Sequence, residues 1–283
     1  MDIGSYEVFM IKAGLFKLDG GAMFGVVPKV LWQKKKPPDE RNRIRMCTNL
    51  LLVKGGGRTI LIDTGNGHKF DDKFKDIYAI DYADNDLDRS LSDHDLSRSD
   101  ITDVIITHLH FDHAGGCTEL NETGGVVPAF PQAKYYVMKR HYEWAINPAA
   151  KDRASYLEEN YKPLLEAGQL VLLDTGGEII PGVEFIVADG HTIGNLSILV
   201  HGDDRKIFYA GEMIPTSAHV PAPWLMGYDL QPLLTIEEKK HYLPRAAEEE
   251  WFVYFMHDPD IPCGLIGPGR KGYELKEIVD MTK

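Results

Sequence analysis

Cysteine is scarce in this sequence. The chain has three cysteines, Cys47, Cys117 and Cys263, which lie far apart and form no CxxC pair. Such spacing favours neither a disulfide framework nor a zinc site built from thiolates, because both need cysteines in pairs. We therefore expect free, partly buried thiols, and functional chemistry carried by other residues.

Long apolar runs are also missing. No stretch reaches the roughly 18 to 20 consecutive apolar residues of a membrane span. The first residues lack the basic and apolar regions of a secretory leader. These observations predict a cytoplasmic protein that has no membrane partner.

Positive charge is in short supply. The chain has 31 Lys and Arg against 43 Asp and Glu, a formal net charge of −12, and residues 34–36 form a short basic run. A surface of that charge repels a polyanion, which argues against nucleic acid as a partner. We expect a small-molecule substrate, and the choice between a monomer and a homodimer stays open.

The chain shows no boundary between domains. Its 283 residues contain no linker-like shift in composition and no low-complexity tract, so we predict one domain over residues 1–283. Residues 6–18 are mostly apolar and β-prone, which predicts an opening strand or hairpin. Residues 19–28 are too rich in Gly and Pro for a regular element. They form either a loop at a pocket mouth or a loop that caps the core.

Two later segments, 49–63 and 195–212, resemble each other. Each has an apolar strand, a turn containing Gly, a basic residue and a second apolar strand that ends at or near an acidic residue. The pattern predicts a β-hairpin in each half of the chain. Two such hairpins suit two packed sheets whose strand ends converge on one cleft.

Helical patterns occur between these strands. Thr235 with Glu238 three residues later fits a capping box at the start of a helix. The acidic segment 69–99 predicts a helix followed by a surface loop. Further helices are expected at residues 139–146, 154–167, 236–250 and from 274 to the C-terminus.

The segment richest in chemistry follows a short β-branched strand. Three histidines and an aspartate lie within six residues, and two glycines follow at once. Solvated histidines rarely crowd together, because each protonation repels the next, whereas neutral imidazoles and a carboxylate are ligands that divalent metal ions prefer. We therefore predict a metal site at His108, His110, Asp112 and His113.

This His-x-His-x-Asp-His pattern resembles the signature of the metallo-β-lactamase superfamily, and other segments agree in order. Residues 61–65 look like the first motif of the family, in which Asp63 has a structural role. Residues 189–195 are similar to the segment that carries its next histidine, and residues 209–212 and 256–258 match its last two motifs. The resemblance covers residues 44–268 and implies an α/β fold, a four-layer αβ/βα sandwich of two mixed sheets flanked by helices.

The resemblance also implies a ligand set. His108, His110 and His191 would hold one ion, Asp112, His113 and His257 the other, and Glu212 would bridge both. We expect two divalent ions, with zinc as the first choice and Fe, Mn or Co as alternatives. Such ions generate hydroxide at neutral pH, and a hydroxide that bridges them would attack the substrate. Asp112 would orient that nucleophile or transfer a proton.

Two residues depart from the family pattern. Glu212 replaces the usual bridging aspartate, and its extra methylene would displace the carboxylate unless the backbone retreats. Asn195 replaces a histidine that usually supports the ligands.

Among family members the chain looks most like N-acyl-homoserine lactone lactonases and the related organophosphate hydrolases. A lactone or ester is therefore the first expected substrate class, with Phe24 and His219 as candidate substrate contacts. Pro215 argues against a lactonase, because these enzymes usually have a tyrosine there that binds the carbonyl oxygen. The alternatives are phosphotriesterases, thioesterases of the glyoxalase II type and, less favoured, diiron redox proteins.

Overall fold

The computed structural model describes residues 1–270 and 272–281. Over these residues the strands form a six-stranded sheet, a seven-stranded sheet and a small two-stranded sheet. The six-stranded sheet has the order β1-β2-β3-β4-β7-β8. Its strands are β1 (Glu7–Asp19), β2 (Arg43–Gly55), β3 (Arg58–Ile62), β4 (Asp103–Ile105), β7 (Lys134–Met138) and β8 (Leu170–Leu173).

The seven-stranded sheet contains the second half of the chain and has the order β15-β14-β13-β12-β11-β10-β9. Its strands are β9 (Gly177–Ile180), β10 (Val183–Val187), β11 (Leu196–His201), β12 (Lys206–Tyr209), β13 (Phe252–Tyr254), β14 (Cys263–Gly269) and β15 (Gly272–Ile278). Both sheets mix parallel and antiparallel pairs, since β3 runs parallel to β4 and β12 runs parallel to β13. The small sheet pairs β5 (Thr118–Leu120) with β6 (Val126–Pro128).

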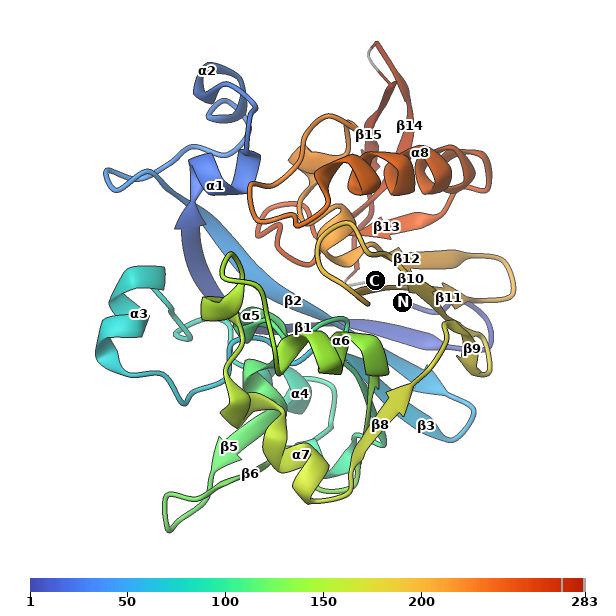
Figure 1. Ribbon diagram of the computed structural model, residues 1–283. Helices are drawn as coiled ribbons and strands as arrows, with labels where there is room; N and C mark the ends of the chain where they lie inside the picture. The colour runs from blue at the N-terminus through green and yellow to red at the C-terminus, as the bar shows by residue number, and fades with distance from the viewer. Residues whose placement is uncertain (271, 282–283) are drawn as a thin grey trace.

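The two sheets pack face to face with helices outside them (Figure 1). Along β2, Leu51 and Val53 point into the core between the sheets, whereas Leu50 and Leu52 belong to the core on the outer face. Alternate side chains of a strand point to opposite faces, so a strand that is apolar throughout is covered on both sides. This arrangement confirms the predicted four-layer α/β sandwich.

Helices cover both outer faces. On the six-stranded sheet the outer core includes side chains from α4 (Leu87–Ser92), α6 (Lys139–Ala145) and α7 (Lys162–Glu166). On the other sheet it includes side chains from α8 (Pro232–Glu248). The remaining helices are α1 (Gly20–Phe24), α2 (Lys29–Trp32), α3 (Asp72–Tyr78) and α5 (Phe111–Ala114).

Six short 3₁₀ turns complete the elements of the described residues. They are η1 (Arg98–Asp100), η2 (Gly115–Cys117), η3 (Arg153–Ser155), η4 (Glu158–Asn160), η5 (Gly211–Met213) and η6 (Ser217–His219). Across residues 1–270 and 272–281, no helix has both the length and the apolar character needed to cross a membrane.

The predicted strands agree well with the structure. The opening strand is β1, and the two similar segments form the hairpins β2–β3 and β11–β12, one in each sheet. Each hairpin is antiparallel and closes through a short turn. The internal resemblance of the sequence therefore marks equivalent elements of the two halves.

Several helix predictions are wrong. The segment from Glu274 belongs to strand β15, which pairs with β14, and residues 154–167 contain η4 and the short α7 rather than one helix. Residues 19–28, expected to lack regular structure, include α1, whose first turn is capped by Asp19 Oδ1 accepting from Ala22 N. The acidic segment 69–99 contains both α3 and α4.

Candidate metal centre

All the predicted ligands follow the carboxyl ends of strands. His108 to His113 follow β4, whereas His191, Glu212 and His257 follow β10, β12 and β13. These last three strands run in the same direction, because β12 is parallel to β13 and β10 is separated from β12 by one antiparallel strand. Their ends therefore meet at one edge of the sandwich, opposite the end of β4.

The first group of side chains is His108, His110 and His191, all buried, with ligand nitrogens within 4.8 Å of one another. His191 Nε2 lies 3.2 Å from His110 Nδ1. Within the described chain, the buried Nε2 atoms of His108 and His110 have no hydrogen-bond partner. Buried polar atoms are almost always satisfied, so these two nitrogens fit the role of metal ligands.

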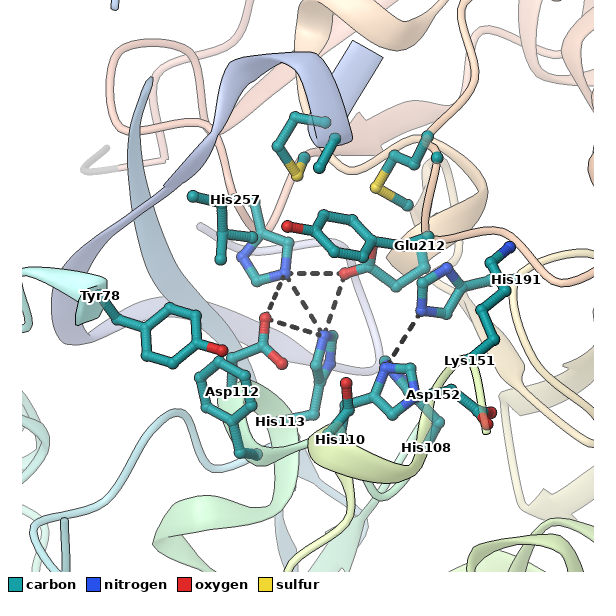
Figure 2. Close-up of a pocket in the computed structure, with 18 residues that line it drawn as sticks. Tyr78, His108, His110, Asp112, His113, Lys151, Asp152, His191, Glu212 and His257 are labelled. Atoms are coloured by element: carbon teal, nitrogen blue, oxygen red, sulfur yellow. Dashed lines mark hydrogen bonds and ion pairs between the residues drawn. The ribbon is translucent and has the colours of Figure 1, made fainter. Parts of the chain in front are cut away.

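The second group is Asp112, His113 and His257, with ligand atoms within the same 4.8 Å. Glu212 lies beside it, because Glu212 Oε1 is 2.7 Å from His257 Nε2 and 3.0 Å from His113 Nε2. Figure 2 shows these four side chains converging, with His191 and His110 next to them. Glu212 thus sits where a shared ligand is needed, and its bridging of two ions stays a prediction.

The electrostatics of the first group fit a metal ion. Burial, followed by the nearby imidazole of His113, holds the pKa of His108 well below its usual range. Burial and His191 do the same to the pKa of His110. Both rings are therefore neutral, which is the form of histidine that binds a metal ion.

The second group brings imidazoles and carboxylates together, and each kind of side chain shifts the pKa of the other. Burial by itself lowers the pKa of His113, but the carboxylates of Asp63 and Asp112 raise it well above its usual range. Burial favours a neutral Glu212, but His257 and His113 hold its pKa well below the usual range. Carboxylates and imidazoles are ligands that Zn, Fe, Mn and Co all accept, so the donor set fits a divalent ion.

Asp63 supports the ligand loop from behind, as its motif implies. It is fully buried and has a positive φ of 61°. Its Oδ1 accepts from Thr107 N at 2.8 Å, and its Oδ2 lies 3.0 Å from His113 Nδ1. The Tyr209 hydroxyl donates to Oδ2 at 3.0 Å, so Asp63 joins elements of both sheets. The contact with Nδ1 leaves Nε2 of His113 free to face the centre.

The two glycines after the ligand cluster allow a close approach of the backbone. A Cβ at Gly115 would overlap Asn66 O, and one at Gly116 would overlap Thr64 O. The turn after Asp63 therefore packs directly on the chain that carries His113. Thr64 N donates to His113 O at 2.8 Å across this contact.

Asp229 was not predicted from the sequence. It is 2% exposed, and its Oδ1 lies 3.0 Å from His191 Nδ1. A carboxylate on one ring nitrogen fixes the orientation of the ring and leaves the other nitrogen for a metal ion. Its distance of 38 residues from His191 left no local pattern that could reveal the contact.

A cavity of about 300 Å³ opens above the two groups. Its apolar lining includes Leu18, Met23 and Met226, which belong to one hydrophobic cluster, and Phe111. Its polar lining includes Lys151, Asp152 and Ser155. The floor consists of the predicted ligands His108, His110, Asp112, His113, His191, Glu212 and His257.

Phe24 and His219, predicted as substrate contacts, do not line this cavity. Both are fully buried and stack on each other with ring centroids 4.6 Å apart. His219 Nε2 lies 2.8 Å from Met23 O, so the pair lies behind the wall and holds Met23 in place. The apolar composition of the segment indicated the wall correctly, but burial directed Phe24 inward and left Met23 facing the cavity.

Pro215 and Asn195 both depart from the family pattern, and they lie in or just after sequence motifs that carry predicted ligands. Pro215 O accepts a hydrogen bond from His257 N at 3.0 Å, so Pro215 positions a ligand through its backbone. Asn195 is buried, and its side-chain amide has no partner among the described residues.

The run 34–36 is not an exposed basic patch, because Lys36 is buried and pairs with Asp258 at 2.5 Å.

Comparison with protein families matches residues 46–265 to the metallo-beta-lactamase superfamily. Among curated relatives, an N-acyl homoserine lactonase of Bacillus cereus is 33% identical over 166 residues, which is 56% of each chain. The chain therefore matches a little over half the length of this relative. A probable metallo-hydrolase of Mycobacterium tuberculosis is 21% identical over 277 residues, covering 85% of this chain and 86% of the relative.

Solved structures extend the similarity to 99% of this chain. A probable metal-dependent hydrolase from Staphylococcus aureus has a TM-score of 0.88 and 29% identity, and the match covers 99% of this chain and 100% of that one. AidC, a dizinc quorum-quenching lactonase in complex with its product, has a TM-score of 0.81 and 21% identity over 99% and 97% of the two chains. At that identity the second match supports the fold alone.

Proposed function

This chain belongs to the metallo-β-lactamase superfamily, and from that premise we propose that it is a hydrolase that uses two divalent metal ions to open a lactone or ester bond. The observation that carries the proposal is the pair of buried ligand groups on the floor of one cavity. A structural metal is usually enclosed by four protein ligands. Here each group offers three side chains and faces open space, which is typical of a catalytic centre.

The ligand assignment follows the two groups. His108, His110 and His191 would hold one ion and Asp112, His113 and His257 the other, with Glu212 shared between them. When bound, such ions lower the pKa of a water from about 15.7 to roughly 7 and polarise a carbonyl oxygen. Zinc is our first choice of metal.

Asp112 has a second task in this proposal. Its carboxylate lines the cavity, and its Oδ2 lies 3.5 Å from His257 Nε2 and 3.9 Å from His113 Nε2. From there it can orient the attacking water and hold its proton. The proton then passes to the alkoxide that leaves when the ester C–O bond breaks.

The walls of the cavity favour a substrate with an apolar tail. Leu18, Met23 and Met226 provide an apolar surface beside the ligands, which suits an acyl chain. The lactonase relatives support a lactone as the first candidate. Phosphotriesters and thioesters remain the alternatives that the experiment has to separate.

The proposal is tested by proton release in weakly buffered solution near neutral pH, using protein reconstituted with Zn or Mn. The substrates are a long-chain homoserine lactone, a simple γ-lactone, an aryl ester, a phosphotriester and an acyl-glutathione thioester. We expect turnover of a lactone or ester that a chelator abolishes. Turnover of only the phosphotriester or thioester, or none at all with two ions bound, would contradict the proposed bond type.

His108→Ala separates the site from the rest of the molecule. The substitution removes a ligand of the first group, so we expect about one ion fewer per chain and at least a 100-fold loss of activity. His94→Ala, at a position outside both groups, is the control and should change neither. Full metal content and full activity in His108→Ala would show that the ligand assignment is wrong.

A further inference from the structure

Two tyrosine side chains line the cavity and have no hydrogen-bond partner for their hydroxyls within residues 1–270 and 272–281. They are Tyr78, at the end of α3, and Tyr228. The buried tyrosines are satisfied within the protein: for example, the Tyr135 and Tyr209 hydroxyls donate to protein acceptors, and the Tyr156 hydroxyl contacts Thr192 Oγ1. A tyrosine hydroxyl usually finds a partner when the ring is buried. The Tyr78 and Tyr228 side chains instead border the cavity, where their hydroxyls are available to a ligand.

The two tyrosines occupy different places around the centre. Tyr228 lies within electrostatic reach of both Asp112 and Glu212, and of Tyr78 itself. Tyr78 is influenced by Asp112 alone among the ligands. Figure 2 shows the Tyr78 hydroxyl directed toward Asp112 from the side of the cavity. The charges of carboxylates from both halves of the chain therefore act on Tyr228, which lines the same cavity as the predicted ligands.

Hydrogen bonds on both sides hold the backbone around Tyr228. Gly227 N donates to Ala22 O at 2.7 Å, which ties the segment to α1. Leu230 N donates to His191 O at 3.0 Å, and the Asp229 side chain contacts the His191 ring. The residues on either side of Tyr228 are thus bound to the cavity wall and to a predicted ligand. Tyr228 itself is 37% exposed, so its ring still borders open space.

We propose that the Tyr228 hydroxyl donates a hydrogen bond to the carbonyl oxygen of the substrate as that oxygen becomes negatively charged. This inference rests on the proposed hydrolysis of a lactone or ester. When the oxygen of water adds to the carbonyl carbon, the C=O electron pair moves onto the carbonyl oxygen. The pair returns when the C–O bond to the alkoxide breaks, and Tyr228 keeps its own proton throughout.

The surroundings of Tyr228 suit a neutral donor. Burial, followed by the charges of Tyr78 and Asp112, raises the pKa of its hydroxyl, so the proton stays in place at neutral pH. Position 215, where the homoserine-lactone enzymes usually have a tyrosine, is a proline and offers no side-chain donor. A fixed donor aimed at developing charge stabilises the transition state more than the ground state.

The test compares Tyr228→Phe with Tyr142→Phe, which removes the same atom from a half-buried tyrosine that does not line the cavity. For the lactone or ester that the wild type hydrolyses, Tyr228→Phe should lower kcat about 10- to 100-fold, somewhat less than the loss of a donor where no metal assists. We expect KM to change less than threefold and Tyr142→Phe to keep kcat within about threefold. Metal content should equal that of the wild type in both variants.

A binding measurement tests the role of the Tyr228 hydroxyl independently of turnover. Titration calorimetry would compare hexylphosphonate, which is tetrahedral and anionic, with hexanoate, which is planar. Tyr228→Phe should weaken the phosphonate about tenfold and hexanoate far less. Unchanged kcat and phosphonate affinity in Tyr228→Phe, or equal losses in Tyr142→Phe, would overturn the inference. If the wild type hydrolyses no lactone or ester, the proposed function fails, and the calorimetry still decides whether Tyr228 binds a tetrahedral anion.

Discussion

At the scale of single residues, the contact between Asp229 and His191 determines how one ligand is presented. Asp229 Oδ1 lies 3.0 Å from His191 Nδ1, and Asp229 Oδ2 accepts from Met226 N at 3.2 Å. The carboxylate is therefore held by its own loop and cannot follow the ring if the ring turns. Such a contact keeps the proton on Nδ1 and the lone pair of Nε2 toward the cavity.

Asp229→Ala tests this role. We expect the affinity of the first group for its ion to fall about 10- to 100-fold, because loss of an outer carboxylate frees the histidine ring. The second group should keep its affinity. Competition with a metal-binding dye measures both sites, and Asp174→Ala, at an exposed position, serves as the control. Equal weakening of the two sites would show that Asp229 acts on the fold rather than on His191.

The metal ligands could be predicted from the sequence because each of them lies in a short, recognisable motif. His108 to His113 are contiguous, and His191 and His257 lie in recognisable motifs. Asp229 and Tyr228 could not be found in the same way, because each acts across space on a residue distant in sequence. Phe24 and His219 failed as substrate contacts because composition does not tell which face of a segment points inward.

At the scale of elements, α8 begins earlier than the sequence indicated. The expected capping box at Thr235 and Glu238 is wrong, because the helix starts at Pro232 and places both residues inside it. Glu238 Oε1 instead accepts from Gly190 N at 3.0 Å, next to His191. Burial raises the pKa of Glu238 to about 7, so this carboxyl is partly protonated at neutral pH.

That shift predicts a dependence of stability on pH. The folded protein keeps the proton of Glu238 up to about pH 7, whereas the unfolded chain loses it near the ordinary value of 4.5. The contribution of Glu238 is therefore fully present below pH 4.5 and declines as pH rises to 7. Glu238→Gln should remove this decline, so that the variant gains roughly 1 to 3 kcal/mol over the wild type between pH 5 and pH 8.

Urea denaturation at the two pH values measures the effect. Glu237→Gln is the matched control, because Glu237 is exposed and pairs with Lys240 on the helix surface. The same pH dependence in wild type and Glu238→Gln would contradict the assignment of the shift to this carboxyl.

Elements stabilised by local pattern were predicted better than elements stabilised by distant partners. The hairpins β2–β3 and β11–β12 carry their own turns, so their sequences were sufficient. Strand β15 has many charged residues and becomes a strand through its pairing with β14. Residues 154–167 do not form one helix because Tyr156 pairs with the backbone of His110 and contacts Thr192.

At the scale of the whole molecule, neither half of the chain holds a complete ligand group. His108 and His110 need His191, and Asp112 and His113 need His257. The first members of each group follow the six-stranded sheet, and the last follow the seven-stranded sheet. An ion in either group would therefore bind the two sheets together at one edge.

Removal of metal should consequently destabilise the entire fold. An ion present at 100 times its dissociation constant stabilises the folded state by about 2.7 kcal/mol. For two ions in a chain of this size we expect a chelator to lower Tm by about 10 °C or more. Calorimetry with and without chelator, followed by addition of zinc, measures the change. A Tm that is unaffected by chelator and by zinc would show that the ions do not join the sheets.

The three cysteines of the chain are all free and buried, so no disulfide joins its two halves. A metal ion bound in either group would act as a cross-link between distant parts of the chain. Contacts between the ligands close a loop of 81 residues at His110 and His191, and one of 144 residues at His113 and His257. A disulfide constrains the unfolded chain as well as the folded one. A metal cross-link would not constrain the unfolded chain, because the ion departs when the ligands separate. The unfolded chain is then free to expand fully, and each refolding must capture its ions anew.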